Sequence, residues 1–283
     1  MLNVKYYETY YFCNVISNIL MEQDSYLRDL HNFHGDGNIL NMLQPFRKHS
    51  VFHDFLEFVI DDVTWDNTYD IDLEERQQLI KNNAHLPIIN KHLKWDILPI
   101  ELALTFHGLE YESFSSFLHE RDKKFTTCDK DDIYDYLLEL RLNGNFEQLI
   151  EHTSKEVFHV LFQNRVLMLV FNTMMANALE REHTVESKSD DLIRKNGKLK
   201  RKNIPSWVRK AVYFRDRGRC VLCNKDLSGT LNLDNVANYD HIVPLSNFGF
   251  NDISNMQLLC KECNQNDKHG GDATTSSFYH SWY

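Results

Sequence analysis

Two pairs of cysteines place the strongest constraint on how this chain folds. Cys220 and Cys223 form one C-x-x-C pair, and Cys260 and Cys263 form the other, near the end of a chain of 283 residues. Four thiolates paired at this spacing are typical of a closed, tetrahedral zinc site. The pattern therefore predicts a structural Zn²⁺ ion that holds two distant turns together.

The bulk composition favours a globular protein in a reducing compartment. The chain is 42% hydrophobic and 25% charged, and no apolar run reaches the roughly 18 residues that a transmembrane helix needs. The first residues, MLNVKYYETYYF, lack the charged and apolar regions of a signal peptide. We therefore expect a cytoplasmic location without membrane attachment, where paired cysteines bind metal rather than form disulfides.

A second set of polar residues is interleaved with the cysteines. Asp240 and His241 stand between the two pairs, Asn255 follows them, and Asn264 comes directly after Cys263. These side chains have no place in a closed zinc site. Oxygen ligands of this kind suit a second, harder cation that keeps open coordination positions. The stretch therefore predicts two metal chemistries in one small region.

Residues 204–270 resemble an HNH nuclease domain, the ββα-metal fold. Asp240-His241 is similar to the Asp-His pair of that motif, and Asn255 is similar to its central Asn. Asn264, which lies 24 residues after Asp240, is similar to its last position. The cysteine pairs resemble those of the zinc-bearing branch, which includes many restriction-like and homing nucleases.

The resemblance implies a role for each residue of the motif. Asp240 and Asn264 would ligate one divalent cation, Mg²⁺ or Mn²⁺, that holds the scissile phosphate. His241 would take a proton from the attacking water. Asn255 would tie down the loop and orient His241, and Lys268 would contact a phosphate. The implied products carry 5′-phosphate and 3′-hydroxyl ends.

Charge is divided unevenly along the chain. Residues 1–193 carry 17 Lys/Arg and 33 Asp/Glu, whereas residues 194–283 carry 14 and 8, so the net charge is −16 in the first part and +6 in the second. A basic region attracts a polyanion, and an acidic region repels it. We therefore expect the C-terminal part to face nucleic acid. The basic side chains expected to bind it are Lys198, Lys200, Arg201, Lys202, Arg209, Arg215, Arg217 and Lys268.

Helical periodicity dominates the part of the chain before the motif. Apolar residues recur every three or four positions there, which is typical of helices with one buried face. Acidic residues precede several of these segments, as expected at helix starts. Helices are predicted at residues 3–32, 51–63, 72–81, 99–107, 111–120, 129–142, 154–182 and 204–217, and strands at residues 239–243 and 256–259.

These elements predict an α+β protein with two domains. An all-helical domain covers residues 1–183, a polar and basic linker covers residues 184–203, and a small zinc-stabilised ββα-metal (HNH) domain covers residues 204–283. The helical domain has no assigned motif. A role in regulation, in targeting, or in contact with a protein partner or a second copy of the chain is open to it.

The favoured interpretation is a metal-dependent endonuclease that hydrolyses DNA phosphodiester bonds. Standalone proteins of this shape resemble effectors of restriction or anti-phage defence. Two alternatives stay open: an RNA-directed nuclease with the same chemistry, and a non-catalytic zinc module that scaffolds a nucleic-acid complex. Mg²⁺-dependent cleavage that is abolished by His241→Ala would separate catalysis from scaffolding.

Overall fold

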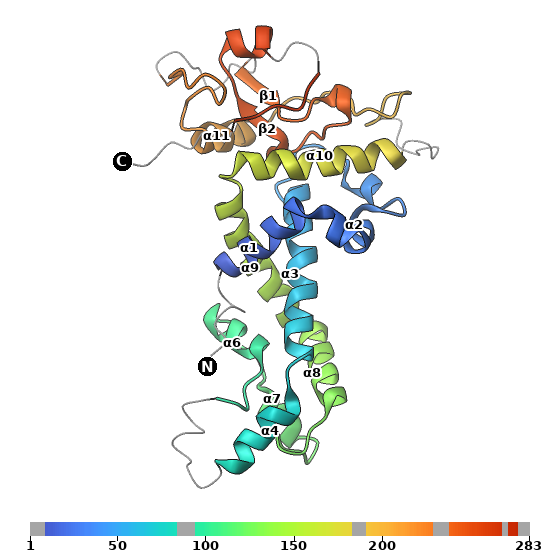
Figure 1. The fold of residues 1–283 in the computed structure, drawn as a ribbon, viewed down its shortest axis with the longest axis vertical. Helices are drawn as coiled ribbons and strands as arrows, with labels where there is room; N and C mark the ends of the chain where they lie inside the picture. The colour runs from blue at the N-terminus through green and yellow to red at the C-terminus, as the bar shows by residue number, and fades with distance from the viewer. Residues whose placement is uncertain (1–8, 84–93, 183–190, 229–237, 268–270, 277–283) are drawn as a thin grey trace. The chain divides into compact units, whose positions relative to one another are not determined.

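The computed structural model describes residues 9–83, 94–182, 191–228, 238–267 and 271–276 (Figure 1). The chain divides into two compact units, each built from two separate stretches of sequence. Unit 1 is residues 1–15 and 56–157, and unit 2 is residues 16–55 and 158–283. Three helices contribute residues to both units: α1 (Thr9–Met21), α3 (Val51–Tyr69) and α9 (Asn145–Leu161).

Several helices of unit 1 begin at acidic or hydroxyl caps. Asp72 accepts the N–H of Glu75 at 2.8 Å, and Asp129 accepts the N–H of Asp132 at 3.1 Å. Such caps satisfy backbone donors that a helix start leaves without partners. Besides its parts of the shared helices, the unit contains α4 (Leu73–Asn82), α6 (Pro99–Phe106), α7 (Phe114–His119) and α8 (Lys130–Leu142), each close to a predicted helix.

Unit 2 contains α2 (Leu27–His34), α10 (Arg165–Glu182) and α11 (Ser206–Arg215). The single helix predicted over residues 154–182 is wrong, since the chain breaks between α9 and α10. The first helix ends at Leu161, and Asn164 caps the start of the second, because its Oδ1 accepts the N–H of Leu167 at 3.1 Å. The break redirects the apolar α10 along the C-terminal part of unit 2.

The sheet of unit 2 has two antiparallel strands, β1 (Tyr239–His241) and β2 (Met256–Leu258). Asp240 lies opposite Gln257, and His241 lies opposite Met256. The strands fall within the predicted ranges but end earlier. Figure 1 shows α10 beneath them, and α10 packs against the 3-10 turn Ile253–Asn255 that leads into β2.

The predicted α+β class is confirmed: helices form most of the described residues, and the sheet lies near the C-terminus. The domain boundaries at 183 and 204 stay a prediction. Residues 184–190 of the predicted linker lie outside the described residues. In the part of the chain that is described, no helix combines the length and the apolar character needed to cross a membrane.

Candidate functional site

The four paired cysteines lie together in unit 2. Their Sγ atoms are all within 4.8 Å of one another, and the Sγ atoms of Cys223 and Cys260 are 3.6 Å apart. Thiolates around a tetrahedral zinc ion at about 2.3 Å are separated by roughly 3.8 Å. The backbone N–H of Cys263 points at Cys260 Sγ at 3.4 Å, which suits a thiolate acceptor. The cluster therefore fits a structural zinc ion.

The first cysteine pair is held on a tight turn. The N–H of Cys220 donates to the carbonyl of Lys225 at 3.0 Å, and the N–H of Asn224 donates back to Cys220 at 2.9 Å. Asn224 has a φ of 62°, a left-handed conformation that Asn tolerates better than most residues. The N–H of Val221 donates to Leu258 at 3.0 Å. This last bond joins the cysteine turn to β2.

Asp240 and His241 line one cavity of about 410 Å³ together with basic side chains. Arg194, Lys198 and Arg201 lie on its wall. The side chain of Asp240 is 18% exposed, whereas His241 is 2% exposed. The cavity thus brings a carboxylate, an imidazole and three cations to the end of β1.

Asn255 holds the loop that follows His241. Its Oδ1 accepts the N–H of Val243 at 2.8 Å, and its Nδ2 donates to the carbonyls of Val243 and Phe250, both at 2.9 Å. Its own carbonyl accepts the N–H of Ile242 at 2.6 Å. Asn255 is fully buried, so these bonds fix the backbone immediately after His241. They also explain why β1 ends early, because a side chain takes the place of the neighbouring strand.

Asn264 lies in the short π-helical turn Cys263–Asp267 and is half-buried. Its N–H donates to the carbonyl of Cys260 at 2.9 Å. Asn264 is not among the described residues that line the cavity of Asp240, so its role as second ligand stays a prediction. Lys268 lies outside the described residues. The chemistry of Asp240 and Asn264 still fits a hard cation, since both side chains can supply oxygen ligands.

Part of the predicted linker forms a hairpin. Ile193 and Leu199 pair across it and are buried, and Gly197 takes a φ of 74° in its turn. Lys198 Nζ lies 5.3 Å from the centre of the Phe248 ring. The Nδ2 of Asn251 donates to the carbonyl of Lys200 at 2.9 Å. The hairpin is therefore fixed against the loop between β1 and β2.

The other basic residues expected to bind nucleic acid lie in varied surroundings. Arg201 is 66% exposed, with Nη2 4.0 Å from Asp240 Oδ1. Lys202, Arg209 and Arg217 are half-buried, and Arg209 donates to the carbonyl of Ile204 at 3.3 Å. Among these residues, Arg201 is the one that the structure places at the cavity. Sequence reasoning missed Arg194 there, although Arg194 opens the basic run.

Arg215 requires a correction. Its guanidinium is fully buried and donates to both carboxylate oxygens of Asp216, at 2.8 and 2.9 Å. It also donates to the carbonyl of Met256 at 2.6 Å. Arg215 therefore holds α11 against β2, and it is not available to a phosphate. Helical periodicity placed it on the solvent face, but its acidic neighbour draws it inward.

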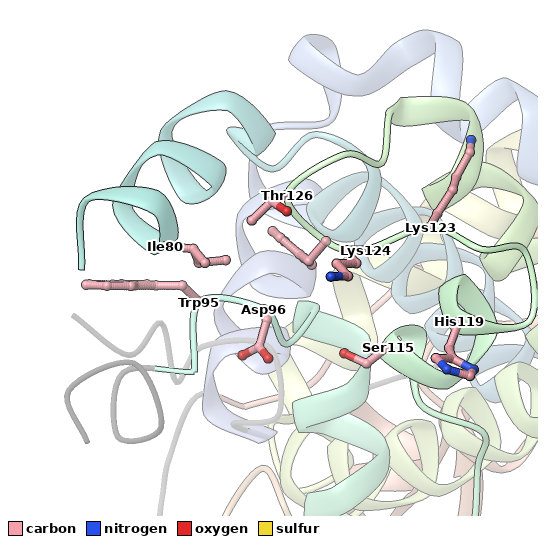
Figure 2. Close-up of a pocket in the computed structure, with 9 residues that line it drawn as sticks. Ile80, Trp95, Asp96, Ser115, His119, Lys123, Lys124 and Thr126 are labelled. Atoms are coloured by element: carbon pink, nitrogen blue, oxygen red, sulfur yellow. The ribbon is translucent and has the colours of Figure 1, made fainter. Parts of the chain in front are cut away.

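Unit 1 contains a different cavity, of about 500 Å³, with Ile80, Trp95 and Phe125 in its lining (Figure 2). Figure 2 shows Lys123 extending away from Trp95. Its Nζ instead donates to both carboxylate oxygens of Asp132 at 2.7 Å. The lining of this cavity also includes Asp96 and Lys124, so it mixes apolar and charged side chains.

Comparisons with known proteins bear on the C-terminal part alone. No curated protein matches the chain, and no solved structure matches it. One family model, described as HNH endonuclease, matches residues 220–278. That stretch holds both cysteine pairs together with Asp240, His241, Asn255 and Asn264. The resemblance read from these residues is thereby confirmed: the C-terminal part of the chain carries an HNH endonuclease domain.

Proposed function

We propose that the chain is a metal-dependent endonuclease that hydrolyses phosphodiester bonds of DNA. The observation that carries this proposal is the cavity where Asp240 and His241 lie beside three cations. A phosphodiester needs a base for the attacking water and positive charge for the phosphate. Both are found at this one place in unit 2, and the HNH match supports the same reaction class.

His241 is the general base in this proposal. It takes the proton of the water that attacks the phosphorus, a role that requires a fixed ring orientation. Its place in β1 and the bonds from Asn255 to the next two residues supply that rigidity. The clustered zinc ligands are four cysteines, and His241 is not among them. Replacement of His241 should therefore leave zinc bound.

Asp240 and Asn264 would hold the catalytic cation, Mg²⁺ or Mn²⁺, through oxygen. When bound, such a cation stabilises charge on the scissile phosphate and on the leaving 3′ oxygen. The four cysteines would hold Zn²⁺ in a purely structural role. The two metals are thereby separated by ligand type, with sulfur for zinc and oxygen for the harder ion.

Arg194, Lys198 and Arg201 bind backbone phosphates on either side of the scissile bond. Arg194 and Lys198 stand on a hairpin that is anchored by buried residues on both arms, and Arg201 follows this hairpin directly. Contacts of this kind recognise the backbone and leave sequence largely unread.

A role in restriction or anti-phage defence, in the cytoplasm, is proposed on family resemblance alone. A plaque assay with wild type and His241→Ala tests that role.

Purified protein incubated with plasmid, single-stranded DNA and RNA tests the reaction. Each substrate is tried with Mg²⁺, with Mn²⁺ and with a chelator. We expect DNA cleavage with either cation and its loss, by about a hundredfold or more, in His241→Ala. The control is His119→Ala, since His119 is an exposed histidine of unit 1. Zinc content is measured for every variant.

Three outcomes would contradict the proposal in different ways. Cleavage by His241→Ala at the wild-type rate would remove His241 as the base. Cleavage of RNA in place of DNA would change the substrate but keep the chemistry. Nucleic-acid binding without cleavage, by protein with full zinc content, would favour the non-catalytic zinc module.

A further inference from the structure

The loop between β1 and β2 is tied to two helices from distant parts of the chain. Asp252 Oδ2 accepts the N–H of Val51, the first residue of α3, at 3.0 Å. Asn172, in the middle of α10, donates from Nδ2 to Ser254 Oγ at 3.2 Å. Both helix residues belong to unit 2, as does the loop. Helical segments that precede the HNH domain by many residues thus contact its central loop directly.

The side chains of Asn172, Ser254 and Asp252 form a continuous hydrogen-bond network. Ser254 Oγ lies 2.8 Å from Asp252 Oδ1 and 3.3 Å from Asn172 Oδ1. A hydroxyl has one proton, and the shorter contact to the carboxylate is the stronger bond. The proton of Ser254 therefore goes to Asp252, and the amide of Asn172 donates to Ser254. Asn172 Nδ2 also donates to the carbonyl of Met168 at 2.8 Å.

These residues are buried, which makes their bonds costly to lose. Asn172 and Asp252 are each 2% exposed, and Ser254 is fully buried. Burial raises the pKa of Asp252, while the hydrogen bonds that Val51 and Ser254 donate to its carboxylate lower that pKa. A buried polar group that loses its partner costs free energy. The loop is therefore strongly held in one position relative to α3 and α10.

Asp252 and Ser254, the two loop residues bonded to the helices, lie just before Asn255 in the chain. The N–H of Asn255 donates to the carbonyl of Asp252 at 3.1 Å, so the two residues move together. The side chain of Asn255 in turn holds Val243, and its carbonyl holds Ile242. A displacement of Ser254 would thus pass through Asn255 to the backbone next to His241.

We propose that Asn172 and Ser254 are positioning residues for the nuclease site. They set the place of Asn255 and, through it, the orientation of His241. Under this proposal α10 and the start of α3 belong to the catalytic unit and are not a separate control domain. The inference rests on the proposed function, because it takes His241 as the base.

The network could instead have only a structural role, and the two roles predict different kinetic results. If it only adds stability, a variant that stays folded should keep the wild-type kcat. If it positions His241, kcat should fall in folded protein while KM for DNA stays within about twofold. A misplacement of about 1 Å at a catalytic group can lower the rate by around a hundredfold.

The test uses the full chain with Asn172→Ala, Ser254→Ala and the double variant. We expect kcat to fall at least tenfold in each single variant, with zinc content unchanged. The double variant should fall no further than the worse single variant, because both act through one link. The control is Thr153→Ala in unit 1. Thr153 is also buried and also bonds the carbonyl four residues earlier in its helix, that of Leu149 at 2.9 Å.

Hydrogen exchange gives a readout that does not depend on cleavage. The amides of Ile242 and Val243 bond to Asn255, and they should exchange faster in Asn172→Ala but not in Thr153→Ala. Unchanged exchange would overturn the link itself. Faster exchange with a wild-type kcat would overturn the positioning role. A wild type that cleaves no substrate would refute the proposed function, and the positioning role would fall with it.

Discussion

A buried ion cluster joins α11 to β2, and removing the charge of its acid should destabilise this part of unit 2. Asp216 Oδ1 and Oδ2 accept from Arg215 at 2.8 and 2.9 Å, and neither side chain is exposed. Asp216 Oδ2 also accepts the N–H of Leu258 at 2.9 Å. Arg165 Nη1 lies 3.6 Å from Oδ1. One carboxylate therefore lies close to two buried guanidinium groups.

The change Asp216→Asn keeps the shape of the side chain but removes its charge. Breaking a buried pair by removing one partner costs about 3–5 kcal/mol, because the other charge stays buried without compensation. Here the fully buried charge of Arg215 would lose its bidentate counterion, so we expect at least about 3 kcal/mol. At about 1.4 kcal/mol per factor of ten, this loss accelerates exchange through unfolding by roughly a hundredfold.

Hydrogen exchange at Leu258 is the direct assay, since its amide donates to the altered carboxylate. Urea unfolding of zinc-loaded protein gives the matching loss of stability. The control is Asp226→Asn, which removes the same charge from the same unit. Asp226 is exposed and lies 3.7 Å from Arg219, which is also accessible to solvent, and such pairs contribute little. If both variants exchange Leu258 at the same rate, the cluster does not stabilise the unit and the reasoning is refuted.

Three further predictions follow from the zinc cluster, a buried acid and the basic hairpin. Cys263→Ser should release zinc and unfold the HNH domain, since structural zinc contributes about 10–16 kcal/mol in small peptides; full zinc content in the variant would contradict this. Burial raises the pKa of Glu101 to about 7 from 4.5, so stability should fall as pH rises through this window, by at most about 3 kcal/mol. Glu101→Gln should remove this pH dependence. If the stabilities of the wild type and the variant change with pH in parallel, the assignment to Glu101 is wrong. Replacing four basic residues by Gln should make the slope of log K against log salt shallower, by up to roughly 0.9 per lost phosphate contact, whereas a flexible linker predicts no change. These residues are Lys198, Lys200, Arg201 and Lys202.

The zinc cluster and the strands could be predicted because their signals are local. A C-x-x-C pair closes its own turn, and two such pairs leave few ways to arrange four thiolates. Asp240 and His241 lie on β1 as expected, since apolar residues flank them on both sides. Their meeting with the basic residues at one cavity follows from the hairpin, which the sequence did not predict.

Contacts between distant residues explain what sequence reasoning missed. Arg215 stands on a basic helix, but its guanidinium donates to the distant carbonyl of Met256 and lies 4.8 Å from the centre of the Phe162 ring. At the hairpin of residues 192–200, the sequence predicts a linker because polar and basic residues dominate the stretch and its apolar residues, Leu192, Ile193 and Leu199, are few. In the structure Ile193 and Leu199 are buried, and the loop between β1 and β2 donates a hydrogen bond to the adjoining Lys200.

The charge of the molecule favours a local rather than a global attraction for nucleic acid. Counted over the full sequence, unit 1 has a net charge of −12 and unit 2 a net charge of +2, which together give the −10 of the chain. A unit so close to neutral has little long-range attraction for a polyanion. At 0.1 M salt, charges are screened over about 10 Å, so the cations that matter are those that contact the phosphates. Arg194, Lys198 and Arg201 line the cavity of Asp240 and His241, where the proposed function places the scissile phosphate. Binding and catalysis would then depend on the same few side chains, and a variant that weakens one should weaken the other.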